Sequence, residues 1–120
     1  DSGYDTHYKK IGEKYGPFDL VFMDSGQYNI RWKAVHNMPD EVIRGFQDLR
    51  GKNLIPIHWA MFTLSLHNWY DPIVESTKLA EKFGLSIMTP RIGQFVELGA
   101  PNIFEKWWIR LIGGVSAQNR

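Results

Sequence analysis

The alternation of short apolar runs with amphipathic segments most restricts the fold of this chain. Two runs, Phe18 to Met23 and Asn53 to Ile57, are typical of buried strands packed by helices. Asp24, Ser25 and Gly26 close the first run with residues that favour turns. Since no internal repeat or Pro/Gly-rich linker divides the chain, the pattern predicts one α/β unit.

Three amphipathic segments predict helices, and each ends at or near a glycine. The second helix begins at Pro39, and the third has Asp71 as its N-cap and Pro72 in its first position. The inward residues are expected to be Tyr4, Tyr8, Ile11 and Tyr15 in the first helix, Val42, Ile43, Phe46 and Leu49 in the second, and Ile73, Leu79, Ala80 and Phe83 in the third.

The last third of the chain carries weaker signals. Ser86 to Met88 and Phe95 to Leu98 predict two short strands. From Pro101 onward the sequence predicts a final amphipathic helix, followed by a polar tail from Ser116 to Arg120. The apolar residues of this helix are Ile103, Phe104, Trp107, Trp108, Leu111 and Ile112.

Composition excludes several classes of function. Fourteen Lys and Arg against thirteen Asp and Glu give a net charge of +1, so there is no basic surface typical of nucleic-acid binding. The absence of cysteine excludes disulfides, thiolate zinc sites and cysteine nucleophiles. No Gly-rich phosphate loop, GxSxG elbow or HExxH helix occurs. Any metal must therefore be held by histidine and carboxylate, and catalysis must use His, Asp or Glu.

No segment of the sequence has the length and hydropathy of a membrane span. Leu54 to Phe62 and Ile103 to Ile112 are the longest apolar stretches, and both fall short of about 20 residues. The first residues lack the basic start and apolar run of a signal peptide, so we expect a cytoplasmic protein. Because no initiator Met is present, we also expect a piece of a longer chain. A membrane-surface role for residues 103–112 rests on amphipathicity alone.

Three residues are candidates for chemistry, each with a simpler alternative. His58 follows a predicted strand, where a metal ligand can be held rigidly, but it could equally be a core histidine. Asp1 precedes a glycine turn and could bind a metal, or simply lie in a frayed terminus. His36 lies in a loop that enters a helix, as a pocket residue or a solvated one. His7 and His67 are interpreted as structural or surface residues.

A series of motifs in one order resembles a known family. The motifs are Asp1-Ser2-Gly3-Tyr4, Ile11-Gly12, Tyr15-Gly16-Pro17-Phe18-Asp19-Leu20, Gly26-Gln27-Tyr28-Asn29, Trp32, His36-Asn37-Met38-Pro39-Asp40-Glu41 and Ile57-His58-Trp59. Together they resemble the carboxyl-terminal half of a metallo-β-lactamase-fold hydrolase, in the branch of N-acyl-phosphatidylethanolamine-hydrolysing phospholipase D and L-ascorbate 6-phosphate lactonase. The resemblance covers residues 1–98 of the single domain 1–120, and residues 99–120 form an amphipathic tail.

The resemblance implies an αββα sandwich with two zinc ions at its edge. Asp1 matches the family carboxylate that bridges both metals, and His58 matches the last metal-binding histidine. His36 matches a histidine over the pocket that contacts the substrate. The implied activity is metal-dependent hydrolysis of a phosphodiester or a lactone, with a small-molecule or lipid substrate, because the bound metals would generate hydroxide near neutral pH.

One departure from the family pattern limits these expectations. The principal ligand motif, His-x-His-x-Asp-His, is absent, and two ligands do not complete a tetrahedral zinc site. We therefore expect the chain alone to be inactive. One sheet face should remain uncovered, so we expect the missing amino-terminal half or a second copy of the chain as partner. The alternative is a non-catalytic interaction module that uses this face and the tail at Trp107 and Trp108.

Overall fold

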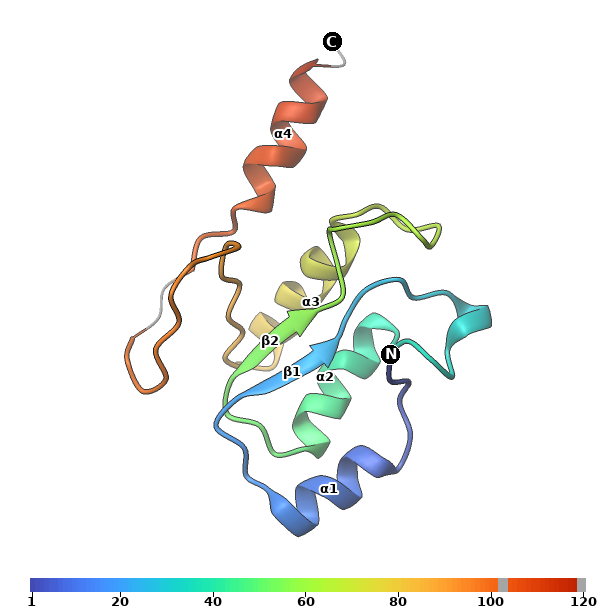
Figure 1. Cartoon of the computed structure of the whole chain (residues 1–120), viewed down its shortest axis with the longest axis vertical. Helices are drawn as coiled ribbons and strands as arrows, with labels where there is room; N and C mark the ends of the chain where they lie inside the picture. The colour runs from blue at the N-terminus through green and yellow to red at the C-terminus, as the bar shows by residue number, and fades with distance from the viewer. Residues whose placement is uncertain (102–103, 119–120) are drawn as a thin grey trace.

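Two parallel strands, β1 (Val21–Asp24) and β2 (Leu54–Ile57), form the centre of the fold (Figure 1). The computed structural model describes residues 1–101 and 104–118. Parallel strands need a crossover connection, which α2 (Pro39–Asp48) supplies. The carboxyl ends of both strands therefore meet at one edge of the sheet.

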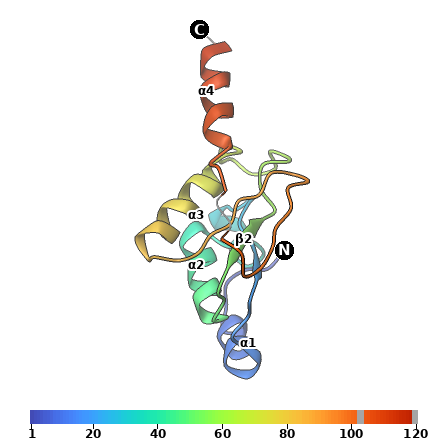
Figure 2. The same ribbon diagram turned by 90° about the vertical axis from the view of Figure 1, so that its left-hand side faces the viewer.

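The helices pack on one side of this two-stranded sheet. Figure 2 shows α2 and α3 (Asp71–Lys82) side by side there, and α1 (His7–Tyr15) lies against α2. The last helix, α4 (Trp108–Gln118), extends away from the other elements in both views. Within the described residues, no helix is long and apolar enough to cross a membrane. The buried core consists of Tyr8, Val21, Met23, Val42, Ile43, Phe46, Leu54 and Ala80.

The two strands predicted from the apolar runs and the second helix are confirmed. β2 lies within its apolar run, β1 begins inside its run and extends one residue further, to Asp24, and α2 begins at Pro39. The Glu41 side chain accepts a hydrogen bond from the Met38 backbone N–H at 3.0 Å, which satisfies an amide group at the helix start. The third helix starts one residue differently, because Tyr70 is its N-cap and Asp71 its first residue. The Asp71 carboxylate accepts instead from the Asn68 amide at 2.8 Å.

The predicted inward faces are only partly correct. In α1, Tyr8 is buried, but Ile11 and Tyr15 are exposed. The helix instead turns Gly12 towards the end of α2, where a Cβ atom would overlap the Asp48 carbonyl oxygen. Phe83 is also exposed, because it is the C-cap of α3 and lies beyond the packed face of that helix.

The last third of the chain departs most from expectation. Ser86 to Met88 forms a single bridge, between Ile87 and Leu54, and not a strand. The strand predicted at Phe95 to Leu98 is wrong: the segment is irregular, and Phe95 is largely exposed, so no burial favours pairing. The final helix is confirmed from Trp108. It continues through the first part of the expected polar tail to Gln118, whereas Ile103 and residues 119–120 lie outside the described residues.

Candidate metal centre

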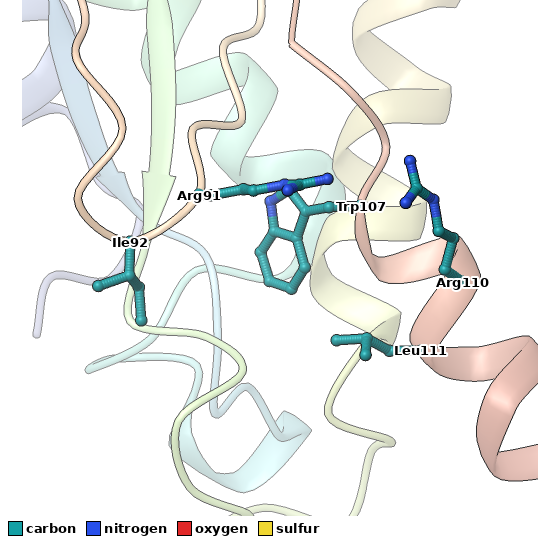
Figure 3. A pocket seen from close by; sticks show the side chains of 5 residues that line it. All are labelled: Arg91, Ile92, Trp107, Arg110 and Leu111. Carbon is teal, nitrogen blue, oxygen red and sulfur yellow. The ribbon is translucent and has the colours of Figure 1, made fainter.

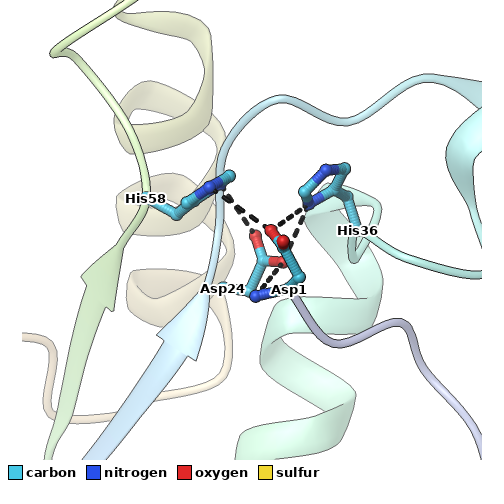
Figure 4. A group of neighbouring side chains, drawn as sticks. All are labelled: Asp1, Asp24, His36 and His58. Carbon is cyan, nitrogen blue, oxygen red and sulfur yellow. Dashed lines mark hydrogen bonds and ion pairs between the residues drawn. The ribbon is translucent and has the colours of Figure 1, made fainter.

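Four side chains from separate segments converge beyond the carboxyl ends of β1 and β2. They belong to Asp1, Asp24, His36 and His58, and one potential ligand atom from each lies within 4.8 Å of the others. Figure 4 shows the two carboxylates between the two imidazole rings, which stack with centroids 5.1 Å apart. The structure thus brings together all three residues selected from the sequence and adds Asp24.

Asp1 lies nearest to His58 within this cluster. Its Oδ1 atom is 3.4 Å from His58 Nε2 and 3.7 Å from His36 Nδ1. The next residue, Ser2, is held by Tyr8, whose hydroxyl lies 2.9 Å from Ser2 Oγ and 3.1 Å from the Ser2 carbonyl oxygen. These contacts position the Asp1 carboxylate beside both imidazoles.

Asp24 is the buried acidic group of the cluster. Its side chain is 4% exposed, and its Oδ2 atom accepts hydrogen bonds from His36 Nδ1 at 2.9 Å and from the Ser2 amide at 3.1 Å. Its Oδ1 atom is buried without a hydrogen bond and lies 3.6 Å from His58 Nδ1. A buried carboxylate oxygen without a hydrogen bond is costly, so this atom indicates a polar or ionic group to be accommodated here.

The backbone at the end of β2 has an uncommon conformation. His58 has a φ of 69° and Ala60 a φ of 71°, in the left-handed region that residues with a Cβ atom seldom occupy. Gly26, after β1, lies so close that a Cβ atom there would overlap the His58 carbonyl oxygen. Strained residues in close contact are typical of functional sites. Here the arrangement points the His58 side chain towards the cluster.

A buried network supports the cluster from below. Asn37 is fully buried, and its Nδ2 atom donates to the Asp24 carbonyl oxygen at 3.0 Å and to the Tyr8 hydroxyl at 3.2 Å. Asn37 thereby connects the strand that carries Asp24 to the residue that holds Ser2. The sequence also places it directly after His36.

The other two histidines have structural contacts. His7 Nε2 lies 3.4 Å from Ser2 Oγ, and the His67 ring stacks on Tyr28 with centroids 4.4 Å apart. Neither belongs to the group of possible metal ligands found in the described part of the chain.

Asp24 is the site residue that sequence reasoning missed. The sequence predicts a turn for it, together with Ser25 and Gly26. Nevertheless, it is the last residue of an apolar strand, as His58 is the first residue after one, and polar residues at the carboxyl ends of parallel strands are where ligands gather. The same rule that selected His58 would have selected Asp24.

A pocket of about 370 Å³ opens beside His58. Gln27 shapes it, since its side chain donates to the Phe62 carbonyl oxygen at 2.6 Å and accepts from the Leu64 amide at 3.0 Å. The pocket is lined by Gln27, His58, Trp59, Met61, Phe62 and Leu64, most of which are apolar. A separate pocket at the base of α4, between Arg91 and Leu111, contains none of the cluster residues (Figure 3).

The donor set of the cluster fits a divalent transition metal. Two imidazoles and two carboxylates are the nitrogen and oxygen ligands that zinc accepts. In a tetrahedral zinc site, ligand atoms about 2.0–2.1 Å from the metal lie roughly 3.3 Å from one another. The 3.4 Å between Asp1 Oδ1 and His58 Nε2 is close to that spacing. These four residues could therefore hold a metal ion.

The sequence is similar to a known family and to several known proteins. Residues 1–59 match the family model described as the beta-lactamase superfamily domain. An uncharacterized protein of Mycobacterium tuberculosis is 33% identical over 111 residues, which cover 90% of this chain and 30% of that protein. Outer membrane protein RomA of Klebsiella pneumoniae is 48% identical over 58 residues, 48% of this chain and 44% of that protein.

A further relative has a name that describes an activity. The N-acyl-phosphatidylethanolamine-hydrolyzing phospholipase D 1 of Caenorhabditis elegans is 41% identical over 73 residues, 58% of this chain and 20% of that protein. The chain thus spans under a third of the length of the mycobacterial and nematode relatives. The family match and these identities confirm the resemblance stated from the motifs. Over residues 1–59 the chain is thus similar to the beta-lactamase superfamily domain.

Proposed function

We propose that this chain is the carboxyl-terminal part of a zinc-dependent hydrolase domain, in which Asp1 and His58 are metal ligands. The main observation for this proposal is the 3.4 Å distance between Asp1 Oδ1 and His58 Nε2. The two residues lie at opposite ends of the family match, yet their ligand atoms come together at the carboxyl edge of the strands. Such convergence is what a metal site built on a sheet edge requires.

Three residues of the cluster have two different roles in this proposal. Asp1 and His58 hold the metal, and His36 contacts the substrate from the loop before α2. When bound, zinc supplies an activated water near neutral pH and polarises the oxygen of the bond under attack. The rings of His36 and His58 stack with centroids 5.1 Å apart, which supports adjacent positions for the substrate group and the metal.

The substrate class is a phosphodiester or a lactone with an apolar portion. The named phospholipase relative supports a phosphodiester. The pocket next to His58 supports an apolar portion, because Met61, Phe62 and Leu64 line it within reach of the cluster. Binding energy from that portion would orient the reacting group over the metal.

The complete site needs donors from elsewhere. A binuclear site in an αββα sandwich takes further histidines, which we assign to the missing amino-terminal half or to a second copy of the chain. Phe22 and Ile57, exposed by 58% and 43% on the strands, are apolar residues that such a partner would cover. We therefore propose that the chain alone is inactive.

Zinc content tests the ligand assignment. The purified chain is loaded with zinc, dialysed and measured by elemental analysis, together with His58→Ala and the matched control His67→Ala, which removes a histidine outside the cluster. With a second copy of the chain supplying the remaining donors, we expect about one zinc per chain, lost in His58→Ala and kept in His67→Ala. Equal zinc content in all three proteins would overturn the assignment of His58.

Hydrolysis assays test the activity. The chain alone, and the chain joined to the rest of its parent protein, are assayed with bis(p-nitrophenyl) phosphate and with a γ-lactone. We expect hydrolysis only by the larger protein, and its loss on zinc removal. Hydrolysis that persists after complete zinc removal would contradict metal dependence.

A second candidate function is a non-catalytic interaction module. The exposed apolar side chains of Phe22 and Ile57 on the strands favour it. In that case the wild-type chain would bind no zinc, and it would form a complex whose stability falls on Phe22→Asp substitution.

A further inference from the structure

We propose that Asp24 is a positioning residue that fixes the tautomers of His58 and His36 by accepting a hydrogen bond from Nδ1 of each ring. The Nε2 atoms are thereby left as lone-pair donors, for the metal in His58 and for the substrate in His36. This inference rests on the proposed function, because it assigns His58 Nε2 to the metal.

Each oxygen of the Asp24 carboxylate lies near the Nδ1 atom of one histidine ring. Asp24 Oδ2 lies 2.9 Å from His36 Nδ1, and Asp24 Oδ1 lies 3.6 Å from His58 Nδ1. An ionised carboxylate only accepts hydrogen bonds, so His36 Nδ1 at 2.9 Å must carry a proton. We infer the same for His58 Nδ1, which at 3.6 Å lies just beyond hydrogen-bond distance. A neutral imidazole with Nδ1–H has its lone pair on Nε2.

The free Nε2 atom of His58 faces the other proposed ligand. It lies 3.4 Å from Asp1 Oδ1, whereas the Nδ1 atom of the same ring lies 3.6 Å from Asp24 Oδ1. Metal-binding histidines commonly donate their second ring N–H to a carboxylate, which fixes the ring and raises its basicity. The order Asp24, His58, metal, Asp1 reproduces this arrangement.

Burial and support make Asp24 suitable for the role. Its side chain is 4% exposed, and its Oδ2 atom also accepts from the Ser2 amide, while the Asp1 amino group lies 3.7 Å away. Asn37 holds the Asp24 carbonyl oxygen at 3.0 Å. The carboxylate therefore has little freedom to rotate. Asp24 Oδ1 has no hydrogen bond and lies 3.6 Å from His58 Nδ1, so a small movement of the His58 ring would be enough to form one.

The first test reads the tautomers directly, without metal. Long-range ¹H–¹⁵N NMR of the histidine rings is recorded on the chain at about pH 8.5, where an ordinary imidazole is neutral. We expect the Nδ1–H form for both His36 and His58 in the folded chain. The reference is the unfolded chain, in which we expect the Nε2–H form for the histidines. The Nε2–H form at either position would overturn the inference, and this measurement needs no variant to fold.

The second test uses Asp24→Asn, with Asp19→Asn as matched control. Asp19 is an exposed carboxylate that pairs with Lys52, so its change removes the same charge outside the site. A carboxamide has only one acceptor oxygen, so we expect at least one of the two histidines to change tautomer in Asp24→Asn and neither in Asp19→Asn. Unchanged tautomers in both variants would overturn the inference.

Metal affinity separates positioning from direct ligation. We expect the dissociation constant for Zn²⁺, measured by calorimetry, to be about 10- to 100-fold higher for Asp24→Asn than for the wild type. The absorption bands of bound Co²⁺ should keep their positions, because the ligand atoms are unchanged. Shifted bands would show that Asp24 itself ligates the metal and would overturn its positioning role. If no protein binds metal, the proposed function fails, whereas the tautomer measurements still decide the role of Asp24.

Discussion

At the residue scale, Gly26 controls the distance between the two strand ends that carry Asp24 and His58. A methyl group at Gly26 would overlap the His58 carbonyl oxygen, and His58 already has a left-handed backbone. The segment after β2 would have to move, because neither backbone can give way locally. The separation of the candidate ligands therefore depends on the absence of one side chain.

We expect Gly26→Ala to lower the free energy of unfolding by about 1–3 kcal/mol, the usual cost of overpacking. Urea denaturation measures this change. The control is Gly113→Ala, where a Cβ atom meets nothing within 4 Å. Because alanine favours helix over glycine, that control should be neutral or stabilising. Equal stability of the two variants would contradict close packing at Gly26.

Tyr28 gives the fold a defined alkaline sensitivity. Burial, and then the carboxylates of Asp71 and Glu75, raise the pKa of Tyr28 to about 12. In the unfolded chain its pKa should be near the ordinary value of about 10. Since the folded state holds the proton more tightly, the stability that the neutral phenol contributes is complete below about pH 10 and is lost as pH rises towards 12.

We therefore expect the urea midpoint of the wild-type chain to fall more steeply between about pH 10 and 12 than that of Tyr28→Phe. Ultraviolet absorbance of the phenolate during titration checks the same pKa. Tyr15→Phe, which removes an exposed tyrosine, serves as control and should keep the wild-type slope. Identical slopes for wild type and Tyr28→Phe would contradict the raised pKa.

At the element scale, the two faces of the sheet contribute differently to the stability of the fold. Phe46 on α2 is 1% exposed in the core, whereas Phe22 on β1 is 58% exposed on the opposite face. Burial of apolar surface stabilises a fold in proportion to the area removed from water. The helix-covered face therefore carries the stability of this chain.

We expect Phe46→Ala to cost about 3–5 kcal/mol, because it loses burial and leaves a cavity. The same change at Phe22 should cost much less in the chain by itself. Paired denaturation curves of the two variants measure the difference. A similar loss at both positions would show that Phe22 is covered, for example by a second copy, and sedimentation would then identify the dimer.

The elements that the sequence predicted correctly are those with strong local signals. The apolar runs predicted β1 and β2, and Pro39 with its acidic first turn predicted α2. The errors have tertiary causes. The face of α1 turned because Gly12 permits close contact with α2, and Phe95 to Leu98 had no partner strand to bury it. Periodicity describes one segment and carries no information about its neighbours.

At the scale of the whole molecule, a tryptophan cluster attaches α4 to the strand edge. Trp59 follows His58, and its ring stacks on Trp107 with centroids 5.3 Å apart and meets Trp108 edge-on at 6.1 Å. Trp108 is 1% exposed, although α4 then extends away from the other elements. The attachment of the carboxyl-terminal segment and the position of the His58 loop are thus connected.

We expect Trp108→Ala to increase proteolytic cleavage of residues 104–118 and to raise the mobility of the neighbouring loop at residues 58–60, because a large buried side chain is lost. Limited proteolysis with mass spectrometry detects the first effect and hydrogen exchange the second. Trp32→Ala removes a tryptophan that is 43% exposed and is the control. Unchanged cleavage in Trp108→Ala would contradict anchoring by this residue.

The sequence by itself determined the α/β class, the two strands and the identity of Asp1, His36 and His58 as candidates, because residue type, spacing and motif order are local properties. Only the tertiary structure decided that these three meet, that Asp24 lies between the two imidazoles, and that Asn37 and Tyr8 support them. The reason is that a site at the edge of a parallel sheet is assembled by crossover connections. They bring distant residues within hydrogen-bond distance without leaving any pattern along the chain.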